Sequence, residues 1–411
     1  MQQKSKIAFI VQRYGLEVNG GAEQHCRLMA EKLTSFYDVD VLTSCALTYL
    51  TWDNHYSEGR SILNDVNILR FPTATSRQIN KTTYNFIRRR KIWQKALKKT
   101  PILNWLEEKI PSLKPQKSDF EQWVYQQGPA TPELITYLEI NQAKYKALIF
   151  FTYLYYPTIN GLEIAPSKSI LIPTAHDENA IYIPFFERLF RLPKTIIYNT
   201  IWEKKFVNQL FKNDHIDAAI GGVGVEIPLN LPYINIKKEY QISKNYLIYI
   251  GRVEAGKGCK KLIDYFKRYN KKNNSIQLVL IGQLFMSLPQ HPDIIPLGFV
   301  SEEVKFNALS QAEILVMPSQ YESLSMVTLE AMKLQKPVIV NEHCAVLKQH
   351  VNSSKGGFSY RGYKDFENAV DKLLTDKVLS RKMGIAGKNY VDENYEWNNI
   401  VSLFKSKIER L

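Results

Sequence analysis

The stretch ILVMPSQYESLSMVTLEAMKLQKPVIV, residues 314–340, places a helical segment between two short β-rich runs. The runs ILVM and PVIV are continuous and apolar, which is typical of parallel strands whose two faces are both buried. A strand, a helix and a second parallel strand together form a βαβ unit. The stretch therefore predicts an α/β fold with a parallel sheet.

The same alternation continues along the chain. Apolar runs such as IAFIV (7–11), SILIPTA (169–175) and YLIYIGR (246–252) are separated by helical patterns. Strands that alternate with helical segments predict repeated βαβ units. At 411 residues the chain is long enough for two domains. Length and pattern together predict two α/β domains.

A change of composition marks the expected domain boundary. Residues 221–245 are first rich in glycine and then in proline and lysine, as is typical of an interdomain link. We therefore expect a first domain over 1–225 and a second over 226–394.

A basic and aromatic segment, from about residue 75 to 129, interrupts the alternation. Its lysines and arginines are interleaved with large apolar residues: Arg88, Arg89, Arg90, Lys91, Lys95, Lys98 and Lys99 among Phe86, Trp93, Trp105 and Trp123. A cationic helical segment of this kind can lie on an anionic membrane surface. A solvated helical insertion packed on the first domain fits equally well, and both interpretations stay open.

The overall charge and the cysteines limit the class of protein. A formal net charge of +14 favours anionic partners: nucleic acid, an anionic membrane or phosphate-bearing small molecules. The cysteines form no CxxC pair and predict neither a zinc site nor a disulfide framework: Cys26, Cys45, Cys259 and Cys344. The apolar run 7–11 is too short for a signal peptide, and the run 147–156 is too short for a membrane-spanning helix. We expect a cytoplasmic protein.

Glu322 and Glu330 mark the strongest candidate site. Glu322 ends the expected strand-to-helix loop and Glu330 lies early in the following helix, at the carboxyl edge of the sheet, where open α/β folds bind ligands. An ionised glutamate can accept hydrogen bonds from both hydroxyls of a ribose. Backbone N–H groups at the helix start suit phosphate or sugar oxygens: those of Leu324, Ser325, Met326 and Val327. Spacing alone equally fits glutamates that the helix dipole favours.

A second candidate is the turn GRVEAGKG, residues 251–258. Gly251 permits a sharp turn, and Arg252 and Lys257 place two cations where a diphosphate could lie. The spacing matches neither the ATP-type phosphate loop nor the dinucleotide fingerprint.

Two loops of the first domain complete the candidates. Gly20 and Gly21 precede a helical run and can form a cradle for a phosphate or a sugar, although a plain strand-to-helix turn fits as well. His176 and Asp177 follow the strand-like run at 169–175, where a histidine can bind a sugar hydroxyl or a helix-capping turn can form.

Together these residues resemble the GT-B superfamily, and within it the family 4 retaining glycosyltransferases of bacterial surface polysaccharides. The resemblance rests on the Gly20-Gly21 loop, His176-Asp177, the Arg252 and Lys257 turn, and Glu322 with Glu330 as the E-x7-E motif. It implies an α/β fold of the GT-B type, with two Rossmann-like domains whose parallel sheets face across a cleft. It also implies that a helix over 395–411 crosses back to the first domain.

The resemblance further implies the chemistry. The chain would be a retaining hexosyltransferase that moves a sugar from a nucleoside-diphosphate sugar to a lipid-linked or glycan acceptor, without a metal ion, a cofactor or nucleic acid. The basic aromatic segment, rather than the resemblance, motivates a possible peripheral contact with the inner face of the cytoplasmic membrane. The implied roles are these: Arg252 and Lys257 hold the diphosphate, Glu322 and Glu330 contact the donor sugar and the ribose, and His176 with Gly20 and Gly21 completes the sugar pocket.

The sequence departs from the family pattern around Glu322. Ser323, Leu324 and Ser325 stand where the family has Gly-Phe-Gly, and Gln335 replaces a glycine. NEHCAVLKQH, residues 341–350, replaces a glycine-rich turn. A non-catalytic partner that binds nucleotide sugars therefore stays an alternative, as does an epimerase or hydrolase of the same fold. Nucleic-acid binding ranks last, because it does not explain the two glutamates.

Overall fold

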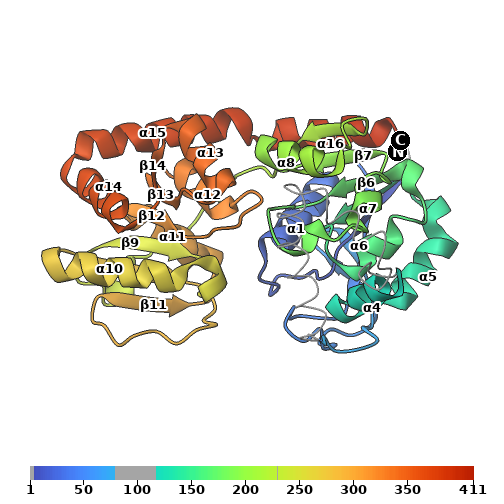
Figure 1. Cartoon of the computed structure of the whole chain (residues 1–411), viewed down its shortest axis with the longest axis horizontal. Coiled ribbons are helices and arrows are strands. Elements are labelled where there is room, and N and C mark those ends of the chain that lie inside the picture. Colours follow the sequence, from blue (N-terminus) through green and yellow to red (C-terminus); the bar gives the residue numbers. More distant parts are fainter. Residues whose placement is uncertain (1–3, 79–116, 229) are drawn as a thin grey trace, which may run out of the picture. The chain divides into compact units, whose positions relative to one another are not determined.

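The computed structural model describes residues 4–78, 117–228 and 230–411. The chain divides into two compact units (Figure 1): Met1–Gly222 with Val401–Leu411 form the first, and Val223–Ile400 form the second. Most of the basic segment expected at 75–129 lies outside the described residues. In the described part of the chain, no helix is both long and apolar enough to span a bilayer.

The first unit is built on an eight-stranded sheet in the order β3-β4-β2-β1-β5-β6-β7-β8. All neighbouring strands are parallel except β3 and β4. The strands are β1 Lys6–Ile10, β2 Asp38–Ser44, β3 Gly59–Leu63, β4 Val66–Phe71, β5 Ala147–Phe151, β6 Ser169–Ile172, β7 Thr195–Tyr198 and β8 Asp217–Ile220. The described helices are α1 Gly21–Leu33, α4 Lys117–Gln127, α5 Pro132–Asn141, α6 Tyr156–Gly161, α7 Phe186–Leu189 and α8 Ile201–Phe211, with short 3-10 turns at Gln142–Lys144, Pro166–Lys168 and Ala180–Tyr182.

Burial on both faces explains the apolar runs of this sheet. Every residue of β5, ALIFF, is buried, as expected for a central parallel strand covered by helices on both faces. Helix α4, the described end of the basic segment, packs Trp123 into this core beside Phe186. That part of the segment is therefore packed on the first unit.

The second unit holds a six-stranded parallel sheet in the order β11-β10-β9-β12-β13-β14. Its strands are β9 Asn245–Ile250, β10 Ile276–Ile281, β11 Ile294–Gly298, β12 Ile314–Met317, β13 Val338–Asn341 and β14 Gly357–Tyr360. Its helices are α9 Ile236–Glu239, α10 Cys259–Asn273, α11 Glu302–Gln311, α12 Met326–Lys333, α13 Ala345–Ser354, α14 Tyr363–Thr375 and α15 Lys377–Asn394, with a 3-10 turn at Ala255–Lys257. The predicted α/β fold with parallel sheets is confirmed.

The final helix, α16 Trp397–Glu409, carries the chain from the second unit into the first. Lys407 donates to both carboxylate oxygens of Asp217 on β8, at 2.7 and 2.8 Å. The Tyr37 hydroxyl donates to Glu409 at 2.8 Å. These contacts attach the end of the chain to the first unit.

Candidate functional site

The second unit brings Lys257 and Glu322 together. Lys257 lies in the 3-10 turn after β9, and Glu322 lies in the loop between β12 and α12. The Lys257 Nζ lies 2.9 Å from Glu322 Oε1, and the two side chains are 25% and 14% exposed. Two groups predicted from separate loops therefore form one partly buried ion pair at the carboxyl edge of the sheet.

Glycines allow the loops around this pair to approach closely. Gly258 has a φ of 81°, and a Cβ on it would lie 2.5 Å from the Pro318 carbonyl oxygen. Gly282, at the end of β10, has a φ of 134°, and its Cβ would lie 2.0 Å from the Gly251 carbonyl oxygen. Any other residue at these positions would force the backbones apart. The glycines thus hold the loop with Gly251 and Lys257 against its neighbours.

Arg252 is also at this edge but has a different partner. Its Nη2 lies 3.2 Å from Glu254 Oε1, and the arginine side chain is 30% exposed. Two cations thus follow β9, and each is accompanied by a carboxylate.

Glu330 lies deeper, in the second turn of α12, and contacts a lysine that the sequence analysis missed. Its Oε1 lies 3.0 Å from Lys305 Nζ, and the side chains of Glu330 and Lys305 are 8% and 13% exposed. Among the described residues, its buried Oε2 has no hydrogen-bond partner. Lys305 sits inside α11, and no local sequence signal distinguishes it from a surface lysine.

The expected N–H cradle is divided between the loop and the helix. Helix α12 begins at Met326, so Met326 and Val327 lie in its first turn, where a helix supplies no internal acceptor. Leu324 and Ser325 precede the helix. Ser325 adopts a left-handed φ of 63°, and its hydroxyl is 2.8 Å from the Thr328 hydroxyl.

The segment 341–350 holds this loop through two side chains. Asn341 Nδ2 donates to the Pro318 carbonyl at 2.9 Å. The His350 Nε2 lies 2.7 Å from the Leu324 carbonyl oxygen. Since that carbonyl is an acceptor, the His350 Nε2–H donates to it. Burial lowers the pKa of His350 to about 4, so the imidazole is neutral near pH 7.

In the first unit, Gly20 and Gly21 lie at the start of α1, with Gly20 as the N-cap. A Cβ on Gly20 would meet the Glu23 carboxylate at 2.2 Å, whereas a Cβ on Gly21 would have no atom within 4 Å. Gly20 is therefore needed for packing against Glu23, and Gly21 faces open space.

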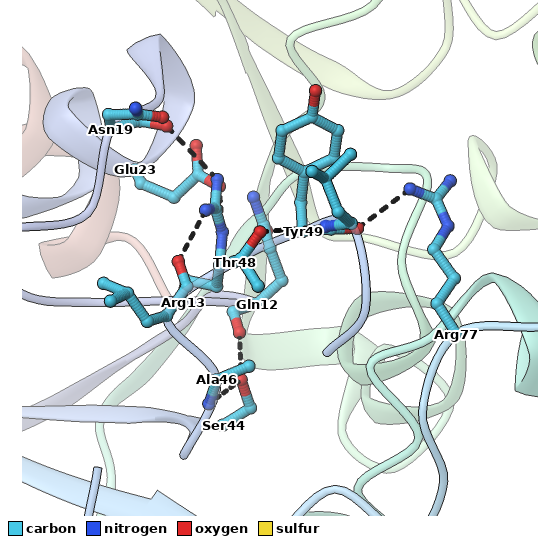
Figure 2. Close-up of polar contacts among 11 residues, drawn as sticks. Gln12, Arg13, Asn19, Glu23, Ser44, Ala46, Thr48, Tyr49 and Arg77 are labelled. Atoms are coloured by element: carbon cyan, nitrogen blue, oxygen red, sulfur yellow. Dashed lines mark hydrogen bonds and ion pairs between the residues drawn. The ribbon is translucent and has the colours of Figure 1, made fainter. Parts of the chain in front are cut away.

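Glu23 is held by a second residue that the sequence analysis missed, Arg13. Figure 2 shows the Arg13 guanidinium beside the Glu23 carboxylate. Arg13 Nε donates to Glu23 Oε1 at 3.0 Å, Nη1 donates to the Leu47 carbonyl at 2.9 Å, and Nη2 reaches the Asn19 carbonyl at 3.4 Å. The two charged side chains are only 4% and 7% exposed. This buried pair fixes the loop in front of α1.

His176 follows β6 in the same unit. Its Nδ1 lies 3.9 Å from Glu178 Oε1, and its side chain is 26% exposed. Asp177 accepts a hydrogen bond from the Tyr182 hydroxyl at 2.7 Å. The buried Glu203 at the start of α8 accepts from the Ala175 N–H and from the Asn199 N–H, at 2.5 and 2.6 Å. Glu203 thus ties the His176 loop to the loop that follows β7.

The candidate residues therefore belong to two sets. His176, Gly20 and Gly21 lie in the first unit, and the Arg252, Lys257, Glu322 and Glu330 set lies in the second. Within the second set, the structure joins Lys257 to Glu322 but pairs Arg252 and Glu330 with other residues.

The family model that matches this chain covers most of the second unit. Residues 234–390, inside the second unit, match the family model described as Glycosyl transferases group 1. A capsular polysaccharide biosynthesis glycosyltransferase, CapM from Staphylococcus aureus, is 25% identical over 40% of this chain and 47% of its own length. The lipopolysaccharide 1,2-N-acetylglucosaminetransferase of Salmonella typhimurium is 25% identical over 52% of this chain and 61% of its own length. The chain spans about half the length of the curated relatives it matches.

Solved structures match over almost the whole chain. Sucrose-phosphate synthase from Thermosynechococcus elongatus has a TM-score of 0.69 at 16% identity and covers 99% of both chains. Anabaena HepE in complex with UDP-glucose has a TM-score of 0.69 at 14% identity and covers 99% of this chain and 100% of its own. The predicted GT-B fold is confirmed, and the predicted resemblance to glycosyltransferases is confirmed by the family match of residues 234–390.

Proposed function

We propose, from the glycosyltransferase match of residues 234–390, that the protein is a retaining, metal-independent transferase. It moves a sugar from a nucleoside-diphosphate sugar to a glycan or lipid-linked acceptor. The observation that carries the proposal is the ion pair of Lys257 and Glu322 at the strand-end edge of the matched unit. The type and position of both residues resemble those of the residues in the family's donor site.

Lys257 and Arg252 would hold the diphosphate of the donor. An ammonium has three N–H donors, so Lys257 can keep its contact with Glu322 while it binds a phosphate oxygen. Negative charge accumulates on the departing diphosphate in the transition state, and cations already in place stabilise it without reorganisation. Glu322 would then accept from hydroxyls of the donor sugar.

Glu330 would bind the ribose. Its Oε1 is held by Lys305 at 3.0 Å, and its Oε2 has no hydrogen-bond partner among the described residues. A buried carboxylate oxygen without a partner is unfavourable unless a donor reaches it. A ribose diol supplies such donors.

The first unit would supply the acceptor side, with His176 and the Gly20-Gly21 loop at the reacting sugar. The acceptor oxygen forms its bond to the anomeric carbon on the face that the diphosphate leaves. The departing phosphate oxygen takes the acceptor proton, and the configuration is retained. No side chain is a covalent nucleophile in this scheme.

The acceptor class follows from the relatives. CapM is named for capsular polysaccharide biosynthesis, and the Salmonella relative is named for lipopolysaccharide. We therefore propose a surface-polysaccharide acceptor, either glycan or lipid-linked, that the protein meets in the cytoplasm at the inner membrane face. These relatives are named as transferases, which favours transfer over the epimerase, hydrolase and non-catalytic alternatives.

A donor screen tests the proposal. The protein is incubated with each common nucleotide sugar and a membrane extract, beginning with UDP-glucose because HepE was solved with it. Lys257→Ala and Glu322→Ala should each lower transfer by about 100-fold or more, since each removes a group that acts on the reacting centre. Lys377→Ala is the matched control, because Lys377 forms an exposed ion pair with Glu313 in the same unit.

Four outcomes separate the possibilities. Transfer that both active-site variants lose and the control keeps supports the proposal. Donor binding without any turnover supports the non-catalytic alternative. The proton spectrum of the product shows whether the anomeric configuration is retained, and activity that disappears with a chelator contradicts metal independence.

A further inference from the structure

Arg77 in the first unit is a partly buried cation whose described hydrogen bonds reach only neutral oxygens. Its Nη1 donates to the Tyr49 carbonyl at 2.9 Å (Figure 2), and its Nη2 donates to Gln127 Oε1 at 3.0 Å. Its Nε is buried and has no partner among the residues that the structure describes. A guanidinium has five N–H groups, so three of them are unused by these two bonds.

Another buried arginine of this unit shows what Arg77 lacks. Arg13 forms an ion pair with Glu23. Within the described ranges, no carboxylate forms an ion pair with Arg77.

The charge of Arg77 is therefore uncompensated in the part of the chain that the structure describes. Removing a cation from water is unfavourable unless an anion accompanies it. Burial lowers the pKa of Arg77 from its usual range, which shows the same cost. An anionic ligand would offset this unfavourable free energy.

The surroundings of Arg77 form one connected cluster. The Tyr49 ring lies 5.5 Å from the Arg13 guanidinium carbon, and the Trp52 indole N–H donates to the Gln127 carbonyl at 2.7 Å. The Tyr155 ring meets Trp52 edge to face, with centroids 5.5 Å apart. Tyr49, Trp52 and Gln127 thus connect Arg77 with Tyr155.

Tyr155 adds a hydroxyl to this cluster. It is the N-cap residue of α6, just beyond the carboxyl end of β5, and it is partly buried. The Arg77 and Arg13 guanidiniums both lie close enough to this hydroxyl to lower its pKa electrostatically, although burial has the larger effect. Burial raises the pKa of Tyr155 to about 12, so the phenol stays a hydrogen-bond donor at neutral pH.

We propose that Arg77 and Tyr155 bind an anionic group of the acceptor, a carboxylate or a phosphate on a sugar. The inference rests on the proposed function, because it assigns the first unit to the acceptor. A guanidinium fork matches both anions, and the phenol adds one donor. The partly buried Tyr49 ring supplies apolar surface beside them, as sugar-binding sites commonly do.

A binding test needs no donor. The melting temperature of the full chain is measured with glucose, glucuronate and glucose 6-phosphate, for the wild type and for the Arg77→Gln, Tyr155→Phe and Lys257→Ala variants. An anionic sugar should raise the melting temperature of the wild type and of Lys257→Ala. Arg77→Gln should lose the rise, and glucose should give none.

The arms of the test identify the anion and its site. A rise with glucuronate alone indicates a carboxylate, and a rise with glucose 6-phosphate alone indicates a phosphate. A rise that Lys257→Ala loses and Arg77→Gln keeps places the anion in the donor site and overturns the proposal. Equal protection by glucose also overturns it.

A kinetic test separates this inference from the proposed function. Arg77→Gln should leave hydrolysis of the donor by water unchanged, because no acceptor takes part in it. The KM for an anionic acceptor should rise about 10- to 100-fold, as expected for the loss of a charge-assisted pair, and the KM for a neutral acceptor should not change. Arg77→Lys, which keeps the charge without the fork, should recover part of the loss.

Each failure has its own signature. A protein that turns over no donor under any condition contradicts the proposed function while the melting test still stands. Donor hydrolysis that falls in parallel with transfer in Arg77→Gln shows a structural role and contradicts the acceptor subsite.

Discussion

Replacing His350 by glutamine should remove a pH dependence from the stability of the second unit. His350 is fully buried, its Nε2 lies 2.7 Å from the Leu324 carbonyl, and its Nδ1 lies 3.1 Å from the Tyr390 hydroxyl. Glutamine also offers one amide donor and one carbonyl acceptor, but it does not titrate. The substitution therefore keeps the type of contact and removes the proton site.

The size of the effect follows from the pKa of His350. Burial lowers it from 6.5 to about 4. The folded state binds the proton less readily than the unfolded state, so this stability is complete above pH 6.5 and is lost as the pH falls towards 4. At about 1.4 kcal/mol per pKa unit, lowering the pKa from 6.5 to about 4 makes the full loss about 3 to 4 kcal/mol. The glutamine variant should be about 1 kcal/mol less stable at pH 7.5 and the more stable protein near pH 4.5.

Urea unfolding from pH 4.5 to 7.5 measures this difference. Trp397 lies in the second unit, and its resonance in fluorotryptophan-labelled protein reports on the unfolding of that unit. His25→Gln is the matched control, since His25 is a buried histidine of the first unit and should not move the Trp397 transition. A difference between wild type and His350→Gln that stays constant across this pH range would refute the reasoning.

Three further substitutions probe buried charges. Glu23→Gln leaves Arg13 buried without its anion and should lower the free energy of unfolding of the first unit by about 3 to 5 kcal/mol. The double change Arg13→Met with Glu23→Leu should recover most of this free energy in the same urea titration. A loss below about 1 kcal/mol in Glu23→Gln would contradict the pairing. Lys305→Met leaves Glu330 without its cation and should raise the KM for the donor at least about 10-fold, with an unchanged KM showing that Glu330 does not depend on Lys305. Burial raises the pKa of Glu203 to about 8, so the stability that Glu203 contributes should fall as the pH rises from 4.5 towards 8. In thermal melts the wild type should therefore lose stability relative to Glu203→Gln over this range; a difference between the two proteins that stays constant with pH contradicts the assignment.

The sheets could be predicted from the sequence because their strands are buried on both faces. ALIFF at β5 and QLVLI at β10 are continuous apolar runs, and the structure buries them completely. β3 was not predicted. Its sequence, GRSIL, forms an exposed antiparallel edge strand that no apolar run marks.

The site could be predicted where local geometry constrains the residue. A turn directly after a strand fixes where its side chains emerge, so Lys257 and Glu322 were identified from the positions of their turns. Lys305 and Arg13 were missed because their roles depend on partners from other elements of the fold. Only tertiary packing distinguishes such a lysine or arginine from a surface residue.

The unusual residues around Glu322 are explained by one another. Ser325 adopts a left-handed φ of 63°, a conformation that costs a non-glycine residue about 1 kcal/mol or more, so the loop needs compensation. The segment that replaces the customary glycine-rich turn supplies it, since Asn341 and His350 bond the Pro318 and Leu324 carbonyls on either side of Glu322. A loop without its glycines is thus held by side chains in place of backbone freedom. The departure from the family pattern is therefore compatible with a fixed Glu322, which is what a donor-binding carboxylate requires.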